Sequence, residues 1–190
     1  MIQSQRGWAL FLSIIFTMIA ACGGSGKPVV TIETDKGKIV IELYPEAAPV
    51  TVDNFLTLID QEFYDGLVFH RYDPGFVIQG GDPKGDGSGG PGWTISGEFQ
   101  DANLRAKMPA HERGTIAMAR TRMPDSAGSQ FYICLNPDPN RYRHLEGQYT
   151  AFGRVIKGLD VVDKIRIGDK MNSVKAKTPR NYLSSEKVSK

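Results

Sequence analysis

Short apolar runs that end at Gly, Pro, Asn or Asp recur along most of this 190-residue chain. The first two runs alternate apolar and polar residues on either side of Asp35-Lys36-Gly37, a pattern typical of a β-hairpin. Further runs of this kind lie at residues 68–70, 76–79, 115–119, 131–135, 151–156 and 171–177. Helical spacing occurs in only two segments, one that begins at Pro49 and one at residues 159–165. A parallel sheet needs a helix after nearly every strand, so this pattern predicts a mainly β fold: a closed antiparallel eight-stranded β-barrel with two capping helices.

The composition is that of one globular domain, with 41% hydrophobic residues and 23 Lys and Arg against 21 Asp and Glu. The formal net charge of +2 is too small to indicate a nucleic-acid partner, and we expect none. Three scattered histidines and two distant cysteines give no metal-ligand spacing, so no metal and no cofactor are expected. No serine lies in a G-x-S-x-G turn, which argues against a hydrolase. Residues 85–90 match a dinucleotide-binding spacing, but Pro91-Gly92 follows where a helix is required, which favours a glycine-rich surface loop.

The N-terminal segment is typical of a secretory signal peptide, because Arg6 precedes an uninterrupted stretch of apolar or small residues at 8–21. This stretch is shorter than the about 20 residues that span a bilayer, and an uncleaved signal anchor is the alternative. The ending Ile19-Ala20-Ala21-Cys22 resembles the lipobox of bacterial lipoproteins, in which the cysteine carries the lipid. We therefore expect an exported protein that is lipid-anchored through Cys22 to a bacterial membrane.

The chain is expected to divide into a lipoprotein signal peptide at 1–21, a lipidated cysteine and tether at 22–26, one folded domain at 27–177 and a disordered basic tail at 178–190. Within the domain, Cys134 lies in an apolar run, where a buried and unreactive thiol is expected.

The stretch from Phe69 to Asp82 carries one arginine, one glutamine and two phenylalanines in strand-like sequence. Two-residue alternation places Phe69, Arg71 and Asp73 on one side of a strand. A strand-borne arginine beside aromatic residues indicates a rigid, partly apolar site.

Four blocks of this sequence, at residues 69–82, 114–119, 128–133 and 145–153, resemble the cyclophilin family of peptidyl-prolyl cis/trans isomerases, here in a bacterial lipoprotein form. The likeness runs from about residue 27 to about residue 177. It implies a monomer that rotates X-Pro bonds in proline-containing polypeptides and assists the folding of exported proteins. A proline-peptide-binding module or chaperone with incidental turnover is the alternative. Arg71 favours the enzyme, because an apolar pocket alone would suffice for binding.

The resemblance also implies roles for individual residues. Arg71 is the implied catalytic group, and Gln79 orients it or holds the substrate. The implied pocket for the proline ring consists of Phe76, Val77, Tyr132 and Leu145. The other implied substrate-binding residues are His70, Gly87, Ala119, Arg120, Thr121, Gln130, His144 and Tyr149. His144 stands where tryptophan is common in the family, which predicts weak binding of the cyclic peptide cyclosporin.

Overall fold

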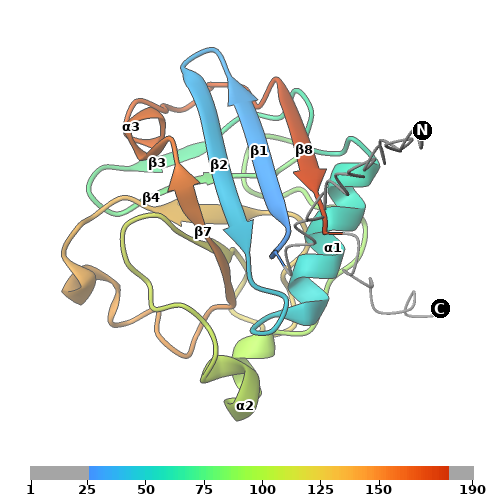
Figure 1. The fold of residues 1–190 in the computed structure, drawn as a ribbon, viewed down its shortest axis with the longest axis vertical. Coiled ribbons are helices and arrows are strands. Elements are labelled where there is room, and N and C mark those ends of the chain that lie inside the picture. The colour runs from blue at the N-terminus through green and yellow to red at the C-terminus, as the bar shows by residue number, and fades with distance from the viewer. Residues whose placement is uncertain (1–25, 180–190) are drawn as a thin grey trace, which may run out of the picture.

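The computed structural model describes residues 26–179, and eight strands account for most of its regular structure (Figure 1). The strands are β1 Val29–Thr34, β2 Gly37–Leu43, β3 Arg71–Asp73, β4 Val77–Gly80, β5 Thr115–Met118, β6 Phe131–Cys134, β7 Ala151–Lys157 and β8 Ser173–Lys177. The helices are α1 Pro49–Asp60, α2 Ala102–Arg105 and α3 Leu159–Val162, with two 3₁₀ turns at Glu98–Gln100 and Pro139–Tyr142. The predicted signal peptide, Cys22 and nearly all of the predicted tail lie outside the described residues.

All eight strands join one antiparallel sheet in the order β3-β4-β6-β5-β7-β2-β1-β8. The predicted hairpin is confirmed, since β1 and β2 pair from Thr34 and Gly37 outward. Gly37 has a φ of +130°, and a Cβ there would lie 2.8 Å from a methyl carbon of Val161. This turn therefore requires glycine for both its backbone conformation and its contact with α3.

The first helix begins at Pro49, as the sequence predicts, and proline suits this first turn because its missing N–H has no partner within a helix. The carboxylate of Glu98 takes the place of a local cap and accepts the backbone N–H groups of Val50 at 2.8 Å and Thr51 at 3.0 Å. On its inner face, Phe55 packs edge-to-face against Phe131 at 5.6 Å. α1 thereby covers one side of the main core, next to β8 in Figure 1.

Two features of the predicted architecture are wrong. The sheet is a curled, open half-barrel, because within residues 26–179 no ladder joins its end strands β3 and β8. Instead, residues 66–69 and 168–171 cross this gap as irregular loops with individual backbone hydrogen bonds, among them Phe69 N–H to Asp169 O at 2.9 Å. The run at 68–70 is consequently no strand, apart from one bridge between Val68 and Lys170. Residues 26–179 also contain three α-helices rather than two, because the one-turn α2, begun by the Asp101 side chain, is too short to leave a periodic pattern.

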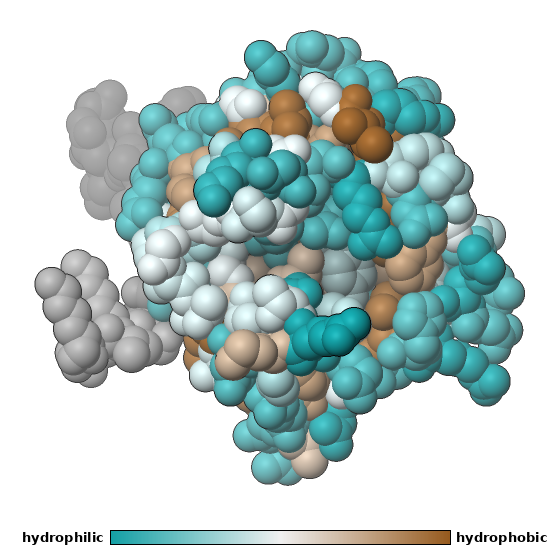
Figure 2. Space-filling model, turned by 180° about the vertical axis from the view of Figure 1, so that it is seen from behind, coloured by the Kyte–Doolittle hydropathy of each residue, from teal (hydrophilic) through white to brown (hydrophobic). Residues whose placement is uncertain are grey.

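The surface of the domain is mainly polar, and Figure 2 shows hydrophobic residues only in small separate groups on one face. The exposed large hydrophobic residues are Val50, Trp93, Met123, Ile156 and Ile167. Between residues 26 and 179, no helix has both the length and the apolar character to cross a membrane. The same residues contain no group of three His, Cys, Asp or Glu side chains placed to hold a metal ion.

Candidate functional site

A groove of about 730 Å³ opens on the face of the sheet that is turned away from the main core. Its walls come from β3, β4 and β6 and from the loops around residues 86–87, 119–120 and 144–149. The lining residues are His70, Arg71, Phe76, Val77, Gln79, Asp86, Gly87, Ala119, Arg120, Tyr132, His144, Leu145, Gln148 and Tyr149. Of the residues assigned to the site from sequence, only Thr121 and Gln130 are outside this groove. They line an adjoining hollow of about 360 Å³ that shares Gln79, Gly87, Ala119 and Arg120 with it.

Four strands contribute one residue each to a row across this face of the sheet. Arg71 on β3 is opposite Gln79 on β4, Gln79 is opposite Tyr132 on β6, and Tyr132 is opposite Ala117 on β5. Directly opposed residues share a face of a sheet. A cation, an amide and an aromatic ring therefore stand side by side on a rigid support.

The guanidinium of Arg71 is tethered on two sides. Its Nη1 donates to Oε1 of Gln79 at 3.3 Å, and its Nη2 donates to a carboxylate oxygen of Asp73 at 3.0 Å. The Arg71 side chain is still 49% exposed. Because a guanidinium has five N–H groups, it keeps free donors for a ligand in the groove.

Gln79 is itself fixed by a chain of amides. Gln130 donates its side-chain NH₂ to the carbonyl oxygens of Gly87 at 3.0 Å and Gly89 at 2.8 Å, so its own Oε1 is left to accept. That oxygen accepts the NH₂ of Gln79 at 2.9 Å, which turns the Gln79 oxygen toward Arg71. The glycine loop is anchored in turn by the buried Asp82, whose carboxylate accepts the backbone N–H of Asp86 at 3.1 Å.

The floor of the groove is apolar. Val77, Tyr132 and Leu145 are buried in a second hydrophobic cluster, separate from the main core. Phe76 is half-buried beside them and stacks against the rings of Tyr142 and His144, with centroids 5.5 and 5.6 Å away. The groove thus combines a fixed cation with a small apolar depression.

The family model described as "Cyclophilin type peptidyl-prolyl cis-trans isomerase/CLD" matches residues 29–185 of this chain. The chain belongs to the cyclophilin family. A peptidyl-prolyl cis-trans isomerase B from Bacillus subtilis is 48% identical over 141 residues, which are 74% of this chain and 92% of that protein. A peptidyl-prolyl cis-trans isomerase from Helicobacter pylori is 46% identical and covers 76% of this cyclophilin and 83% of its own length. This cyclophilin is accordingly a peptidyl-prolyl cis-trans isomerase.

Among solved structures, a cyclophilin-type isomerase from Cryptosporidium parvum, crystallised in the presence of the dipeptide Ala-Pro, superimposes with a TM-score of 0.68. It shares 28% sequence identity and covers 79% of this cyclophilin and 99% of its own chain. The cyclophilin AquaCyp293 from Hirschia baltica gives a TM-score of 0.65 at 27% identity, with coverage of 77% and 73%.

In this cyclophilin, the guanidinium of Arg120 is tied to backbone carbonyl oxygens. Its Nε and Nη2 donate to the carbonyl oxygen of Gln148 at 2.9 and 2.7 Å, and its Nη1 donates to the carbonyl oxygen of Thr121 at 2.8 Å. The guanidinium also lies over the rings of Phe99 and Tyr149, at 4.9 and 4.7 Å from their centroids. Arg120 therefore ties two walls of the groove together.

His70 lines the groove as a neutral, half-buried ring. Neither ring nitrogen has a hydrogen-bond partner within residues 26–179. Burial lowers its pKa, and this effect exceeds the opposite influence of the carboxylates of Asp82 and Asp86.

The expected alternation of Phe69, Arg71 and Asp73 holds only in part. Arg71 and Asp73 share a face, whereas Phe69 precedes β3 and is fully buried in the main core against Phe131. Sequence reasoning also missed Asp86 and Gln148, which line the groove from loops. Loop residues follow no periodic pattern, so only the position of Asp86 inside the glycine-rich segment could have indicated it.

Proposed function

We propose that this cyclophilin is exported, is held to a bacterial membrane by a lipid on Cys22, and isomerises X-Pro bonds in other exported proteins. The proposal is supported by Arg6, the apolar stretch at 8–21 and the sequence Ile19-Ala20-Ala21-Cys22. Folding polypeptides outside the cytoplasm contain X-Pro bonds that equilibrate over tens to hundreds of seconds, so an isomerase tethered there would act on a slow step.

The chemical task is to lower a rotational barrier. Resonance gives the peptide C–N bond partial double-bond character and a barrier of about 18–20 kcal/mol. In the twisted transition state this resonance is lost, and the proline nitrogen regains a lone pair that accepts a hydrogen bond. A donor placed at that nitrogen binds the transition state more strongly than the planar ground state, which is the requirement for catalysis.

Arg71 is the donor that the groove supplies for this role. The observation that carries the assignment is the row of Arg71, Gln79 and Tyr132, in which a cation tethered on two sides stands beside an apolar floor. Because Gln79 and Asp73 hold the guanidinium, little reorganisation is needed when the lone pair forms.

The apolar floor is the proposed site of the proline ring. Phe76, Val77, Tyr132 and Leu145 would surround the ring, and the exclusion of water there disfavours the charge-separated planar amide. The substrate main chain would continue along Ala119–Thr121 toward Gln130 in the adjoining hollow. His70, Gly87, His144 and Tyr149 would form the sides of this path.

The test of the catalytic assignment is a protease-coupled assay of a Pro-containing peptide with Arg71→Ala. Removal of one preorganised donor lowers rates by about two to three powers of ten, and we expect a loss of this size in kcat/KM. Arg113→Ala is the matched control, since it removes an arginine from a surface ion pair with Asp163 outside the groove. Near-normal activity of a folded Arg71→Ala protein would contradict the assignment.

The alternative role, a proline-peptide-binding module with incidental turnover, makes a different prediction for the same variant. If binding is the function, Arg71→Ala should still assist the refolding of a proline-rich client at the wild-type rate. If isomerisation is the function, this assistance should fall together with kcat/KM.

The anchor is tested by labelling with radioactive palmitate in a bacterial host. Cys22→Ser should take up no label and retain its signal segment, whereas Cys134→Ser should be labelled like the wild type, because Cys134 is buried in the domain. Absence of label from the wild-type protein would overturn the lipoprotein proposal and leave the isomerase assignment intact.

A further inference from the structure

His111 lies directly behind the floor of the groove. It is only 2% exposed and does not line the groove itself. Its Nε2 is 3.0 Å from the hydroxyl oxygen of Tyr132, and the two rings stack with centroids 6.1 Å apart and planes inclined by 19°. Tyr132 does line the groove, so His111 supports a floor residue from the interior side.

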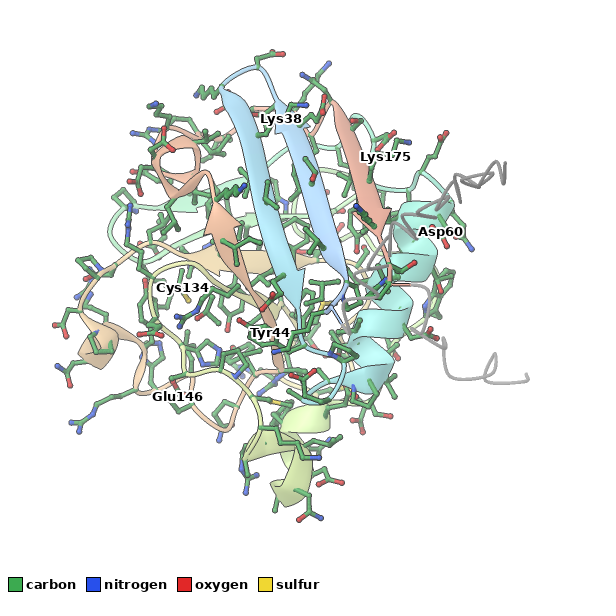
Figure 3. All side chains as sticks on the ribbon, viewed as in Figure 1. Lys38, Tyr44, Asp60, Cys134, Glu146 and Lys175 are labelled. Carbon is green, nitrogen blue, oxygen red and sulfur yellow. The ribbon has the colours of Figure 1, made fainter. Side chains whose placement is uncertain are left out.

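Glu146 holds His111 from its other side. One carboxylate oxygen accepts the backbone N–H of His111 at 2.7 Å, and the other lies 3.3 Å from Nδ1, without the alignment of a hydrogen bond. Glu146 follows Leu145, which forms part of the apolar floor. Glu146 is labelled in Figure 3 and lies near the molecular surface. His111 therefore links the strand that carries Tyr132 to the segment that carries Leu145.

The surroundings also determine where the protons lie. A carboxylate only accepts hydrogen bonds, so the ring proton belongs on Nδ1, which faces Glu146. Nε2 is then left to accept the O–H of Tyr132. Burial lowers the pKa of His111 despite Glu146, so the ring is neutral at pH 7. The hydroxyl of Tyr132 accordingly points into the interior, and its carbon ring is left to face the groove.

We propose that His111 is a positioning residue of the isomerase, which acts through the Tyr132 hydroxyl to fix the ring at the base of the proline pocket. The inference rests on the proposed role of Tyr132 in binding the proline ring. Loss of the partner at Nε2 leaves a buried hydroxyl unsatisfied, which costs more than the bond itself contributes. The Tyr132 ring then turns to find another partner, and the shape of the floor changes.

A double-mutant cycle on KM tests this coupling. His111→Leu should raise KM for a Pro-containing peptide by about tenfold, with kcat changed less than about threefold, since a misplaced floor weakens binding of ground and transition states alike. In a Tyr132→Phe background, where no hydroxyl needs a partner, the same change should move KM by less than about twofold. His111→Gln offers an amide oxygen to the hydroxyl and should restore most of the wild-type KM.

An equal rise of KM in both backgrounds would show that His111 acts through the general fold and would overturn the proposal, as would an unchanged KM in His111→Leu. A measurement on the wild-type protein avoids any dependence on folding of the variants: nitrogen-15 shifts of the His111 ring should place the proton on Nδ1, and a proton on Nε2 would contradict the arrangement. Arg71→Ala in the same assay distinguishes a failure of the catalytic assignment from a failure of the proposal on His111. If it is fully active, the proposed catalytic assignment fails, whereas the KM cycle continues to report on His111 alone.

Discussion

Gln79 stands directly across the β3–β4 ladder from Arg71 and accepts a hydrogen bond from its guanidinium at 3.3 Å. The same amide donates to Gln130 at 2.9 Å, and Gln130 reaches the glycine loop. The orientation of Arg71 thus depends on Gln79, eight residues along the chain, and through Gln130 on the more distant glycine loop.

Replacement of Gln79 by leucine should leave Arg71 tethered only to Asp73. We expect kcat/KM to fall by about tenfold, less than for Arg71→Ala, because the donor remains but is less well oriented. The measurement is the protease-coupled assay, with Gln100→Leu as the control, since Gln100 is exposed and its side chain hydrogen-bonds only to Asp125 among the described residues. A Gln79→Leu protein with wild-type kcat/KM would show that the amide chain does not position Arg71.

Arg120→Met should loosen the wall of the groove. Methionine keeps much of the apolar stem but removes two donors from the carbonyl oxygen of Gln148. We expect KM for a Pro-containing peptide to rise by about three- to tenfold. This change corresponds to a loss of binding free energy of roughly one ordinary hydrogen bond. Arg122→Met is the matched control two residues away, and an equal effect of both variants would point to general charge rather than to the clamp.

Sensitivity to cyclosporin should be low and should increase in His144→Trp. His144 is exposed and stacks on Phe76 at the edge of the apolar floor. An indole offers a larger apolar face and an N–H in a different direction, which together are expected to improve affinity by about one to two powers of ten. An inhibition titration of both proteins decides the matter, and tight inhibition of the wild type would show that position 144 does not control this ligand.

The free energy of unfolding should decrease as the pH falls below about 6.5, the ordinary pKa of histidine. Burial lowers the pKa of both His70 and His111, so in this range the unfolded chain binds more protons than the folded one. The contribution is complete above about pH 6.5 and is lost as the pH falls toward the lowered folded-state values.

Urea unfolding between about pH 8 and pH 5.5 measures this slope. Burial raises the pKa of the Glu98 carboxyl group, which contributes a slope of opposite sign where it titrates. His111→Gln should reduce the pH dependence. A stability that is independent of pH in the wild type would contradict the burial of the two neutral rings.

Sequence patterns that span only a few residues were sufficient to predict much of the fold. The β1–β2 hairpin and the start of α1 at Pro49 depend on turn residues and spacing within a few positions, and both are as predicted. Cys134, which is labelled in Figure 3, is buried as expected, and burial raises the pKa of its thiol to about 12.

Local sequence patterns could not predict the arrangement of the site. Arg71, Gln79 and Tyr132 meet only because β3, β4 and β6 are neighbours in the sheet, and the strand order is set by contacts between distant segments. Resemblance supplied these residues, whereas it did not supply Asp86, Gln148 or the support of Tyr132 by His111. The closure of the barrel was misjudged because the run at 68–70, which was expected to be a strand, lies in a loop that meets residues 168–171 only through individual hydrogen bonds and one bridge.

The alternation along β6 has a consequence for how this enzyme can be altered. Phe131 and Ile133 enter the main core, while Tyr132 and Cys134 belong to the separate cluster beneath the groove. Substitutions on the two faces share few direct contacts, so their effects on the free energy of unfolding should be close to additive. Substrate preference can then be redesigned on one side of a single strand, while losses of stability are repaired independently on the other.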